Sequence, residues 1–234
     1  MVAFETEVIE VVRRTPEVKS FRFKSPGGAD FRAGQFFFVT IRIGGAERTK
    51  HFSFSNSPTE KDYIEFTKKI TGSDYSKALD GLKPGDWARL KMPLGSFTYE
   101  GDIKKIAFLA GGIGITPVRS ICKYAVDTAS GADITLLYGS RSAGYIIFKE
   151  DFDSMQNEFS GLRVSYLVSE PDDGWHGRTG RIDAKVIKEE IPDYAERRFY
   201  ICGPPSMVDA MDKILAEELY LPREMIVIEK FTGY

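Results

Sequence analysis

The stretch that decides the fold of the second half of the chain is Ile106-Ala107-Phe108-Leu109-Ala110-Gly111-Gly112-Ile113-Gly114-Ile115-Thr116-Pro117. Its first five residues form an apolar run without alternation, which predicts a strand buried on both faces. The glycines allow a tight turn, and Pro117 suits the first turn of a helix, where its missing N–H is not needed. Such a turn can hold a diphosphate on backbone N–H groups. The same glycines also suit a purely structural turn.

Strands and helices alternate downstream of this stretch. We expect further strands at residues 134–138, 163–168, 198–202 and 225–229, and helices near residues 148–155, 183–191 and 206–219. Strands that alternate with helices are typical of a parallel α/β sheet. The sequence therefore predicts an α/β nucleotide-binding domain over residues 101–234.

The first hundred residues show a different pattern. Short segments rich in Val, Ile, Phe and Thr, many of them alternating, occupy residues 4–14, 18–25, 35–43, 50–56 and 62–70. Turn signals such as Gly44-Gly45 separate them, and one short helix is expected over residues 73–82. Regularly spaced strands of this kind predict an antiparallel β-barrel over residues 1–100.

The charge balance excludes some classes of protein. The 234 residues include 32 Lys and Arg against 34 Asp and Glu, which gives a net charge of −2. A nucleic-acid-binding protein would normally be basic, so we expect no nucleic-acid partner. No apolar run approaches the ~20 residues that span a bilayer. The N-terminal stretch carries charges among its apolar residues, which does not fit a signal peptide. We therefore expect a cytoplasmic protein.

Cysteine and histidine are scarce. The chain has two cysteines, Cys122 and Cys202, and two histidines, His51 and His176. These are too few for an iron–sulfur cluster or a zinc site rich in cysteine or histidine. The sequence therefore predicts no metal site, and any redox chemistry would need an organic cofactor.

Polar residues follow two other strands of the predicted parallel sheet. Ser140 and Arg141 come after residues 134–138, and Gly203-Pro204 comes after Cys202. Ligands of an open parallel sheet bind at the carboxyl ends of its strands, so these loops join the glycine turn as one candidate site. Arg141 can pair with a phosphate, although an ordinary surface arginine is the simpler interpretation. Cys202 also suits a buried apolar position.

The barrel half carries a second candidate cluster. Lys50-His51-Phe52-Ser53 puts a cation, an aromatic ring and a hydroxyl on one strand, and Gly72-Ser73 begins the short helix. Together they could hold an aromatic cofactor with a phosphate. The alternative is structural: Phe52 would belong to the core, and Ser73 would only cap the helix.

At these residues the chain resembles the ferredoxin–NADP reductase family of flavoproteins. The similarity runs through the whole chain in the family's order. The matching motifs are Phe31-x-x-Gly34-Gln35-Phe36, Lys50-His51-Phe52-Ser53, Gly72 to Ser76, Gly85-Asp86, Pro93 to Phe97, Gly111 to Pro117, and Cys202-Gly203-Pro204 with Met207.

The resemblance implies a role for each matching residue. At the reacting centre it implies Ser53 near flavin N5, Cys202 beside the nicotinamide, Glu229 near the flavin edge and Phe231 over the flavin ring. Residues implied to hold FAD are Lys50, His51, Phe52, Ser53, Thr67, Lys69, Gly72, Ser73 and Ser76, with Phe231 or Tyr234 as the ring cover. Residues implied to hold NADP(H) are Gly111, Gly112, Gly114, Thr116, Ser140, Arg141, Cys202, Gly203 and Pro204.

The sequence also departs from the family. Lys50 stands where the family has arginine, so a bidentate grip on phosphate is replaced by a point charge. Phe52 stands where the family has tyrosine, and Thr232-Gly233-Tyr234 extends beyond the usual final aromatic residue. The cysteines that would bind an iron–sulfur cluster are missing, so electrons are expected to leave to a separate acceptor.

The resemblance implies an FAD-dependent oxidoreductase that transfers a hydride between NAD(P)H and FAD and electrons onward to a separate redox protein such as ferredoxin. NADPH is slightly favoured over NADH, because Tyr145 stands where NADH-dependent relatives often have an acidic residue. Two alternatives remain: a reductase of free flavin or quinone, and a non-catalytic electron-transfer subunit of a larger complex.

Overall fold

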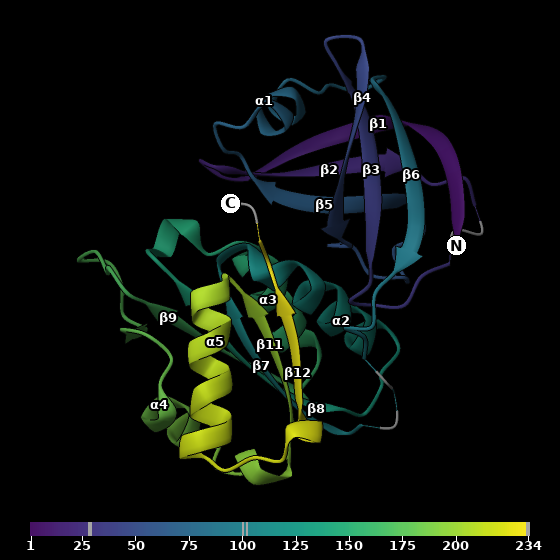
Figure 1. The fold of residues 1–234 in the computed structure, drawn as a ribbon. Coiled ribbons are helices and arrows are strands. Elements are labelled where there is room, and N and C mark those ends of the chain that lie inside the picture. The colour runs from purple at the N-terminus through teal and green to yellow at the C-terminus, as the bar shows by residue number, and fades with distance from the viewer. Residues whose placement is uncertain (28–29, 100, 102, 233–234) are drawn as a thin grey trace.

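The computed structural model describes residues 1–27, 30–99, 101 and 103–232. In the first half one antiparallel sheet curls on itself, with strand order β4-β3-β6-β1-β2-β5 (Figure 1). Its elements are β1 (Val2–Thr15), β2 (Val18–Lys24), β3 (Phe36–Ile43), β4 (Ala46–Ser53), β5 (Tyr63–Lys69), α1 (Asp74–Asp80) and β6 (Trp87–Leu94). The two end strands meet where Phe54, just after β4, bridges to Phe66 of β5. The antiparallel barrel predicted from the sequence is therefore confirmed.

The interior of this curled sheet is aromatic. Phe37, Val39 and Ile41, at every second position of β3, are buried in it. Phe66 lies at the centre: its ring stacks on Phe21 with centroids 5.0 Å apart and on Phe52 at 4.2 Å. Phe54 is also fully buried. This packing fixes the end of β4, which carries the Lys50–Ser53 motif.

The second half contains one parallel sheet with strand order β10-β9-β8-β7-β11-β12. Its strands are β7 (Lys105–Gly111), β8 (Asp133–Ser140), β9 (Leu162–Val168), β10 (Arg178–Thr179), β11 (Arg198–Gly203) and β12 (Ile226–Lys230). The chain order reverses between β7 and β11. This is the position at which open parallel sheets bind ligands, and the glycine turn lies there.

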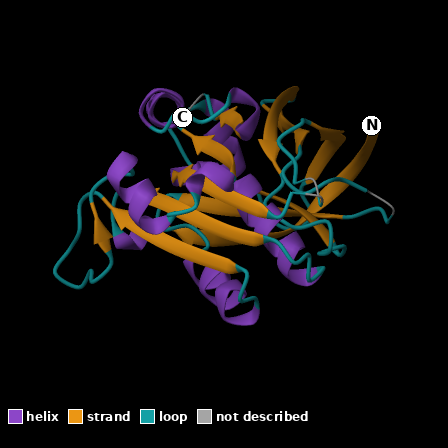
Figure 2. Ribbon diagram, turned by 90° about the horizontal axis from the view of Figure 1, so that it is seen from below, coloured by secondary structure: helices purple, strands orange, loops and turns teal. Residues whose placement is uncertain are grey.

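Helices cover both faces of the parallel sheet, as Figure 2 shows. Helices α2 (Ile115–Asp127) and α3 (Lys149–Glu158) pack on one face, where Phe108 and Ala110 of β7 point. Helices α4 (Ala184–Glu190) and α5 (Pro205–Lys213) pack on the other, over Ala107 and Leu109. All five residues of the Ile106–Ala110 run are fully buried, so the predicted α/β domain is confirmed. Among the residues described, no helix is long and apolar enough to cross a membrane.

Several details differ from the sequence-based expectation. Strand β6 was not among the predicted segments, although Ala88, Leu90 and Met92 alternate and are fully buried. Pro93 within it weakens the strand signal, because proline cannot donate to a sheet. The expected helix over residues 206–219 is α5 followed by a π-helical turn at Ile214–Glu218. The predicted domain boundary at residues 100–101 stays a prediction, since residue 100 lies outside the described residues.

The two halves share one apolar layer. Phe97 of the barrel half packs edge-to-face on Tyr200 of β11, with centroids 5.3 Å apart, in the same cluster as Ile121 of α2. Gly34 makes this approach possible. A Cβ at residue 34 would lie 2.1 Å from the carbonyl oxygen of Phe97 and 2.9 Å from Cδ1 of Ile121.

We therefore predict that Gly34→Ala strongly destabilises the protein. Its backbone φ is +95°, and the added methyl group has no space, so the free energy of unfolding should fall by more than about 2 kcal/mol. Gly45→Ala is the matched control, because Gly45 also has a positive φ, +82°, but open space around it. Gly45→Ala should lower the free energy of unfolding by about 1 kcal/mol. Equal losses in urea unfolding would contradict the steric explanation.

Candidate functional site

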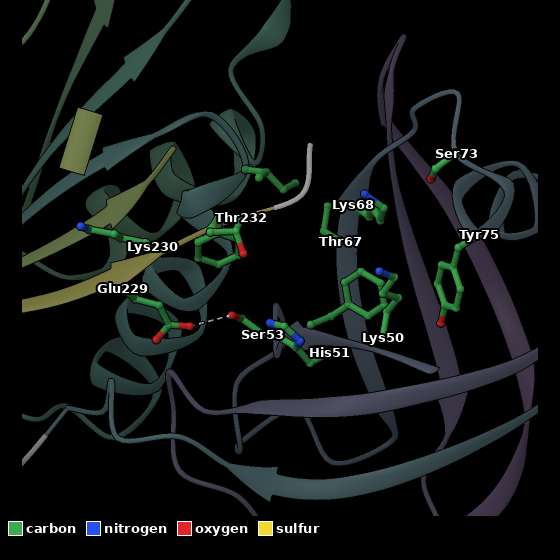
Figure 3. Close-up of a pocket in the computed structure, with 13 residues that line it drawn as sticks. Lys50, His51, Ser53, Thr67, Lys68, Ser73, Tyr75, Glu229, Lys230 and Thr232 are labelled. Atoms are coloured by element: carbon green, nitrogen blue, oxygen red, sulfur yellow. Dashed lines mark hydrogen bonds between the residues drawn. The ribbon is translucent and has the colours of Figure 1, made fainter. Parts of the chain in front are cut away.

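A cavity of about 370 Å³ lies between the two halves of the molecule. Its size falls in the range of small-molecule sites, roughly 300–1,000 Å³. Figure 3 shows the barrel half contributing one wall and the segment that contains Glu229 and Thr232 contributing the other. The lining residues are Lys50, His51, Phe52, Ser53, Thr67, Lys68, Ser73, Tyr75, Ile113, Glu229, Lys230, Phe231 and Thr232.

The barrel wall is held by backbone register and by α1. Lys50 pairs with Val39 across β3 and β4, and the Tyr75 hydroxyl of α1 donates to the Val39 carbonyl at 2.8 Å. Ser73 caps α1 by accepting from the Ser76 N–H. The fully buried Ser76 hydroxyl in turn accepts from the Thr71 N–H at 2.7 Å. Ser76 therefore shapes the turn, while Ser73 reaches the cavity.

Two lysines line the same wall. Burial and the neighbouring charge of Lys50 lower the pKa of Lys68. Two cations that share a cavity suit an anionic ligand, because a bound anion relieves their repulsion. The sequence predicted Lys69 here, but its ammonium group pairs with Glu17 at 3.0 Å and does not line the cavity. The neighbouring residue Lys68, which the sequence analysis missed, lines the cavity instead.

Ser53 and Glu229 face each other across the cavity. The Ser53 hydroxyl lies 3.5 Å from Oε1 of Glu229 (Figure 3). Burial raises the pKa of Glu229 to about 7. A carboxyl group with a pKa near 7 can both hold and release a proton at physiological pH.

Cys202 lies next to Glu229 in the sheet, since the two residues pair between β11 and β12. Its side chain is fully buried. Burial, together with the charge of Glu229, raises the pKa of the Cys202 thiol well above its ordinary value. The thiol is therefore neutral, which makes it a poor nucleophile.

The glycine loop packs tightly against the end of β11. A Cβ at residue 114 would lie 2.4 Å from the Cys202 carbonyl oxygen, and one at residue 111 would lie 2.2 Å from the Met207 sulfur. Gly112 differs, because it has open space around it and a φ of +52°. The structural interpretation therefore accounts for Gly111 and Gly114, while Gly112 leaves room for a ligand near the backbone.

Residues within and beside the glycine loop link it to the cavity and to the end of β11. The Thr116 hydroxyl, almost fully buried, donates to the Ile113 carbonyl at 3.2 Å. Ile113 itself lines the cavity, so the loop connects the cavity to the reversal point between β7 and β11. Gly203 is the last residue of β11, on the other side of that point, and Pro204 follows it.

Arg141 and Ser140 lie at the end of β8, outside the set of cavity-lining residues described above. Nε of Arg141 pairs with Glu170 at 2.8 Å, and both side chains are mostly exposed. The Ser140 hydroxyl donates to the Ser142 carbonyl at 3.0 Å. Nearby, Arg178 of β10 pairs with Glu189 and Glu190 of α4.

The end of β12 forms the second wall. The Phe231 N–H donates to the Gly203 carbonyl at 3.0 Å, which ties this residue to the end of β11. Lys230 lines the cavity, but its side chain extends away from Ser53 (Figure 3), and its ammonium group pairs with Asp209 of α5 at 2.6 Å. Tyr234, the alternative ring cover, lies outside the described residues, so the choice between it and Phe231 stays a prediction.

Two family models match the chain, one in each half. The model described as an oxidoreductase FAD-binding domain matches residues 5–99. The model described as an oxidoreductase NAD-binding domain matches residues 108–213. The first match falls on the curled sheet and the second on the parallel sheet.

Curated relatives match most of the chain. It is 28% identical over 237 residues to the reductase component of propane 2-monooxygenase from Mycolicibacterium goodii, which covers 97% of this chain and 67% of the relative. It is 32% identical over 212 residues to NADH-cytochrome b5 reductase 1 from Ajellomyces capsulatus, covering 84% and 68%. The chain therefore spans about two thirds of the length of these relatives.

A solved structure of a cytochrome P450 reductase from Amycolatopsis superimposes on this one with a TM-score of 0.86. The match covers 99% of this chain and 71% of that chain at 24% identity. At this identity the likeness concerns the fold alone.

The raised pKa of Glu229 leads to a prediction for Glu229→Gln. The folded-state pKa, about 7, lies above the ordinary value of 4.5. Ionisation of Glu229 therefore opposes folding, with the full effect above pH 7 and none below the unfolded-state pKa. We expect Glu229→Gln to raise the thermal midpoint at pH 8 and to change it little near pH 4.5. The exposed Glu218→Gln is the control. An effect of Glu229→Gln that is independent of pH would show that its ionisation is not the cause.

Proposed function

The chain belongs to the ferredoxin–NADP reductase-like family of flavoproteins, and we propose that its interdomain cavity is where a hydride passes between NAD(P)H and FAD. As a member of this family it is a flavin-dependent NAD(P)H oxidoreductase. The observation that carries the proposal for the site is the cavity itself, in which Ser53 of the flavin half faces Glu229 of the nucleotide half.

The cavity-lining residues fit FAD. The paired charges of Lys50 and Lys68 suit its diphosphate, and Phe52 offers an aromatic ring to the isoalloxazine. Gly72 has open space beside it, so the backbone there can lie close to a phosphate. FAD, when bound, supplies the chemistry of accepting a hydride and releasing electrons. Lys69 is not included, because it does not line the cavity.

The residues of the chain have distinct tasks around the reacting atoms. The Ser53 hydroxyl is a hydrogen-bond donor aimed across the cavity, and Glu229 holds or releases a proton near it. The neutral Cys202 thiol gives the nicotinamide a small, uncharged neighbour. Phe231 covers the site and excludes water until a nicotinamide displaces it. Hydride transfer needs the reacting atoms about 3–3.5 Å apart, so positioning is the main contribution of the protein.

For the electron acceptor we propose a separate redox protein, a ferredoxin or an oxygenase component. The support comes from the relatives, which include the reductase component of an oxygenase and a cytochrome b5 reductase. Anaerobic titration tests the function: the purified yellow protein should bleach with NADPH or NADH and regain its colour when an oxidised ferredoxin is added. A protein that neither nucleotide bleaches would be a non-catalytic module.

The two lysines lead to a prediction about the flavin. Lys50→Ala and Lys68→Ala should each weaken FAD binding at least about tenfold, because each removes a charge-assisted contact to the diphosphate. Lys69→Ala should bind FAD as the wild type does, since Lys69 does not line the cavity. Flavin fluorescence during dilution measures the affinity. Chromatography of the released cofactor identifies it, and FMN as the sole flavin would overturn the assignment.

The nucleotide preference leads to a second prediction. We infer a preference for NADPH, with Arg141 exchanging Glu170 for the 2′-phosphate; the pair is exposed, so a dianion can compete with the carboxylate. Arg141→Ala should then lower kcat/KM for NADPH at least about tenfold and leave that for NADH nearly unchanged. Glu170→Gln should raise kcat/KM for NADPH. Equal changes with both nucleotides would show that Arg141 does not contact the 2′-phosphate.

A further inference from the structure

Arg119 of α2 is a buried cation whose guanidinium group joins both halves of the molecule. Only 6% of the residue is exposed. Toward the barrel half, Nη1 donates to the Ser55 carbonyl at 3.1 Å and Nη2 to Oε1 of Glu60 at 3.1 Å. Within its own half, Nε donates to Asp151 of α3 at 3.0 Å. One planar group therefore fixes three segments of the chain at once.

The next residue of α2 makes a second contact with the same segment. The Ser120 hydroxyl donates to the Asn56 carbonyl at 2.7 Å. Two successive residues of the helix thus hold two successive carbonyl groups of the barrel half. We call these two contacts, with the Arg119–Glu60 pair, the interdomain clamp.

The barrel side of the clamp is itself rigid. Glu60 accepts from the Ser57 N–H at 2.6 Å and from the Tyr63 hydroxyl at 2.9 Å. Burial opposes the ionisation of Glu60, but its hydrogen bonds, first of all the one with Arg119, outweigh this and lower its pKa. The Ser55 hydroxyl donates at 2.7 Å to the fully buried Glu65, which also pairs with Arg14 and Arg22.

The clamp lies between the two parts of the proposed site. Ser55 follows Ser53, the cavity residue at the end of β4, by two positions. Arg119 stands one helical turn after the glycine loop that ends at Gly114. Arg119 is not among the described residues that line the cavity. Its contacts therefore act on the spacing between the Ser53 strand and the glycine loop.

We propose that Arg119 is a positioning residue. It sets the distance between the strand that ends at Ser53 and the glycine loop, and this distance determines the rate of hydride transfer. This rests on the proposed function. Misplacement by about 1 Å can slow such a reaction about a hundredfold. A buried ion pair adds little to stability compared with apolar packing, so stability alone gives little reason for placing charges here.

Arg197 provides a matched control. It is also buried, 1% exposed, and its guanidinium contacts Asp193, Asp133 and the Ile106 carbonyl. All of these partners belong to the second half, and Ile106 and Asp133 lie near the starts of β7 and β8, at the end of the sheet away from the glycine loop. A substitution at Arg197 removes a buried charged network without touching the clamp.

The first experiment compares Arg119→Gln, Arg119→Lys and Arg197→Gln by stopped-flow reduction of the bound flavin. Arg119→Gln should slow reduction at saturating nucleotide at least about tenfold, while FAD content and nucleotide Kd change less than about twofold. Arg119→Lys keeps the positive charge but lacks the planar guanidinium group, so its rate of flavin reduction should be intermediate. Arg197→Gln should lower the thermal midpoint at least as much as Arg119→Gln does, and its reduction rate should stay near that of the wild type.

The second experiment does not depend on activity. Hydrogen exchange of Arg119→Gln should become faster both at residues 53–60 and at residues 111–120, on either side of the clamp. In Arg197→Gln the first of these segments should exchange as in the wild type. If Arg119→Gln does not fold, Ser120→Ala weakens the same clamp and should show both effects at smaller size.

Two results would overturn the proposal. One is an Arg119 variant that reduces flavin at the wild-type rate despite lower stability. The other is hydrogen exchange that changes only within the second half. If the wild-type protein reduces flavin with neither nucleotide, the proposed function fails, and the exchange experiment still decides whether Arg119 clamps the two halves.

Discussion

The site depends on one constraint: the antiparallel and the parallel sheet must keep a fixed position relative to each other, because each supplies one wall of the same cavity. Arg119 and Ser120 of α2 hold the segment after β4, and the close approach at Gly34 lets the apolar layers merge. Without that fixed placement of the two sheets, Ser53 and Glu229, which are 176 positions apart in the sequence, would not face each other. Glu229 is a residue of the second half whose pKa is raised by burial, and the barrel half supplies its hydrogen-bond partner Ser53.

Much of the fold could be predicted because the spacing of apolar residues along the chain indicates which faces of a strand or helix are buried. The unbroken run Ile106–Ala110 indicates a strand covered on both faces, and it is. The limits appear where two local signals compete. Strand β6 alternates as clearly as its neighbours, but Pro93 obscures it. The barrel also closes through an isolated bridge between Phe54 and Phe66, a contact that no local pattern predicts.

The candidate site shows the same division. The motifs Lys50–Ser53 and Gly111–Pro117 were identified from the sequence, the first by a cation, an aromatic ring and a hydroxyl on one strand, the second by glycines between a buried strand and a helix. The choice between Lys68 and Lys69 was not, because adjacent lysines at a strand end differ only in the neighbours they meet after folding. Gly114 shows a further limit: packing against Cys202 already requires a glycine there, so its presence alone does not identify a ligand.

The position of β12 has a consequence for how the protein is made. This strand follows every other described strand in the chain, yet Glu229 and Phe231 at its end form the second wall of the cavity, as Figure 1 suggests from its course toward the barrel. During translation the barrel half emerges from the ribosome first and can begin to fold as a unit. The cavity, however, cannot be complete until the last strand has left the exit tunnel. A nascent chain that has exposed only its first half therefore carries one wall of the cavity without the other.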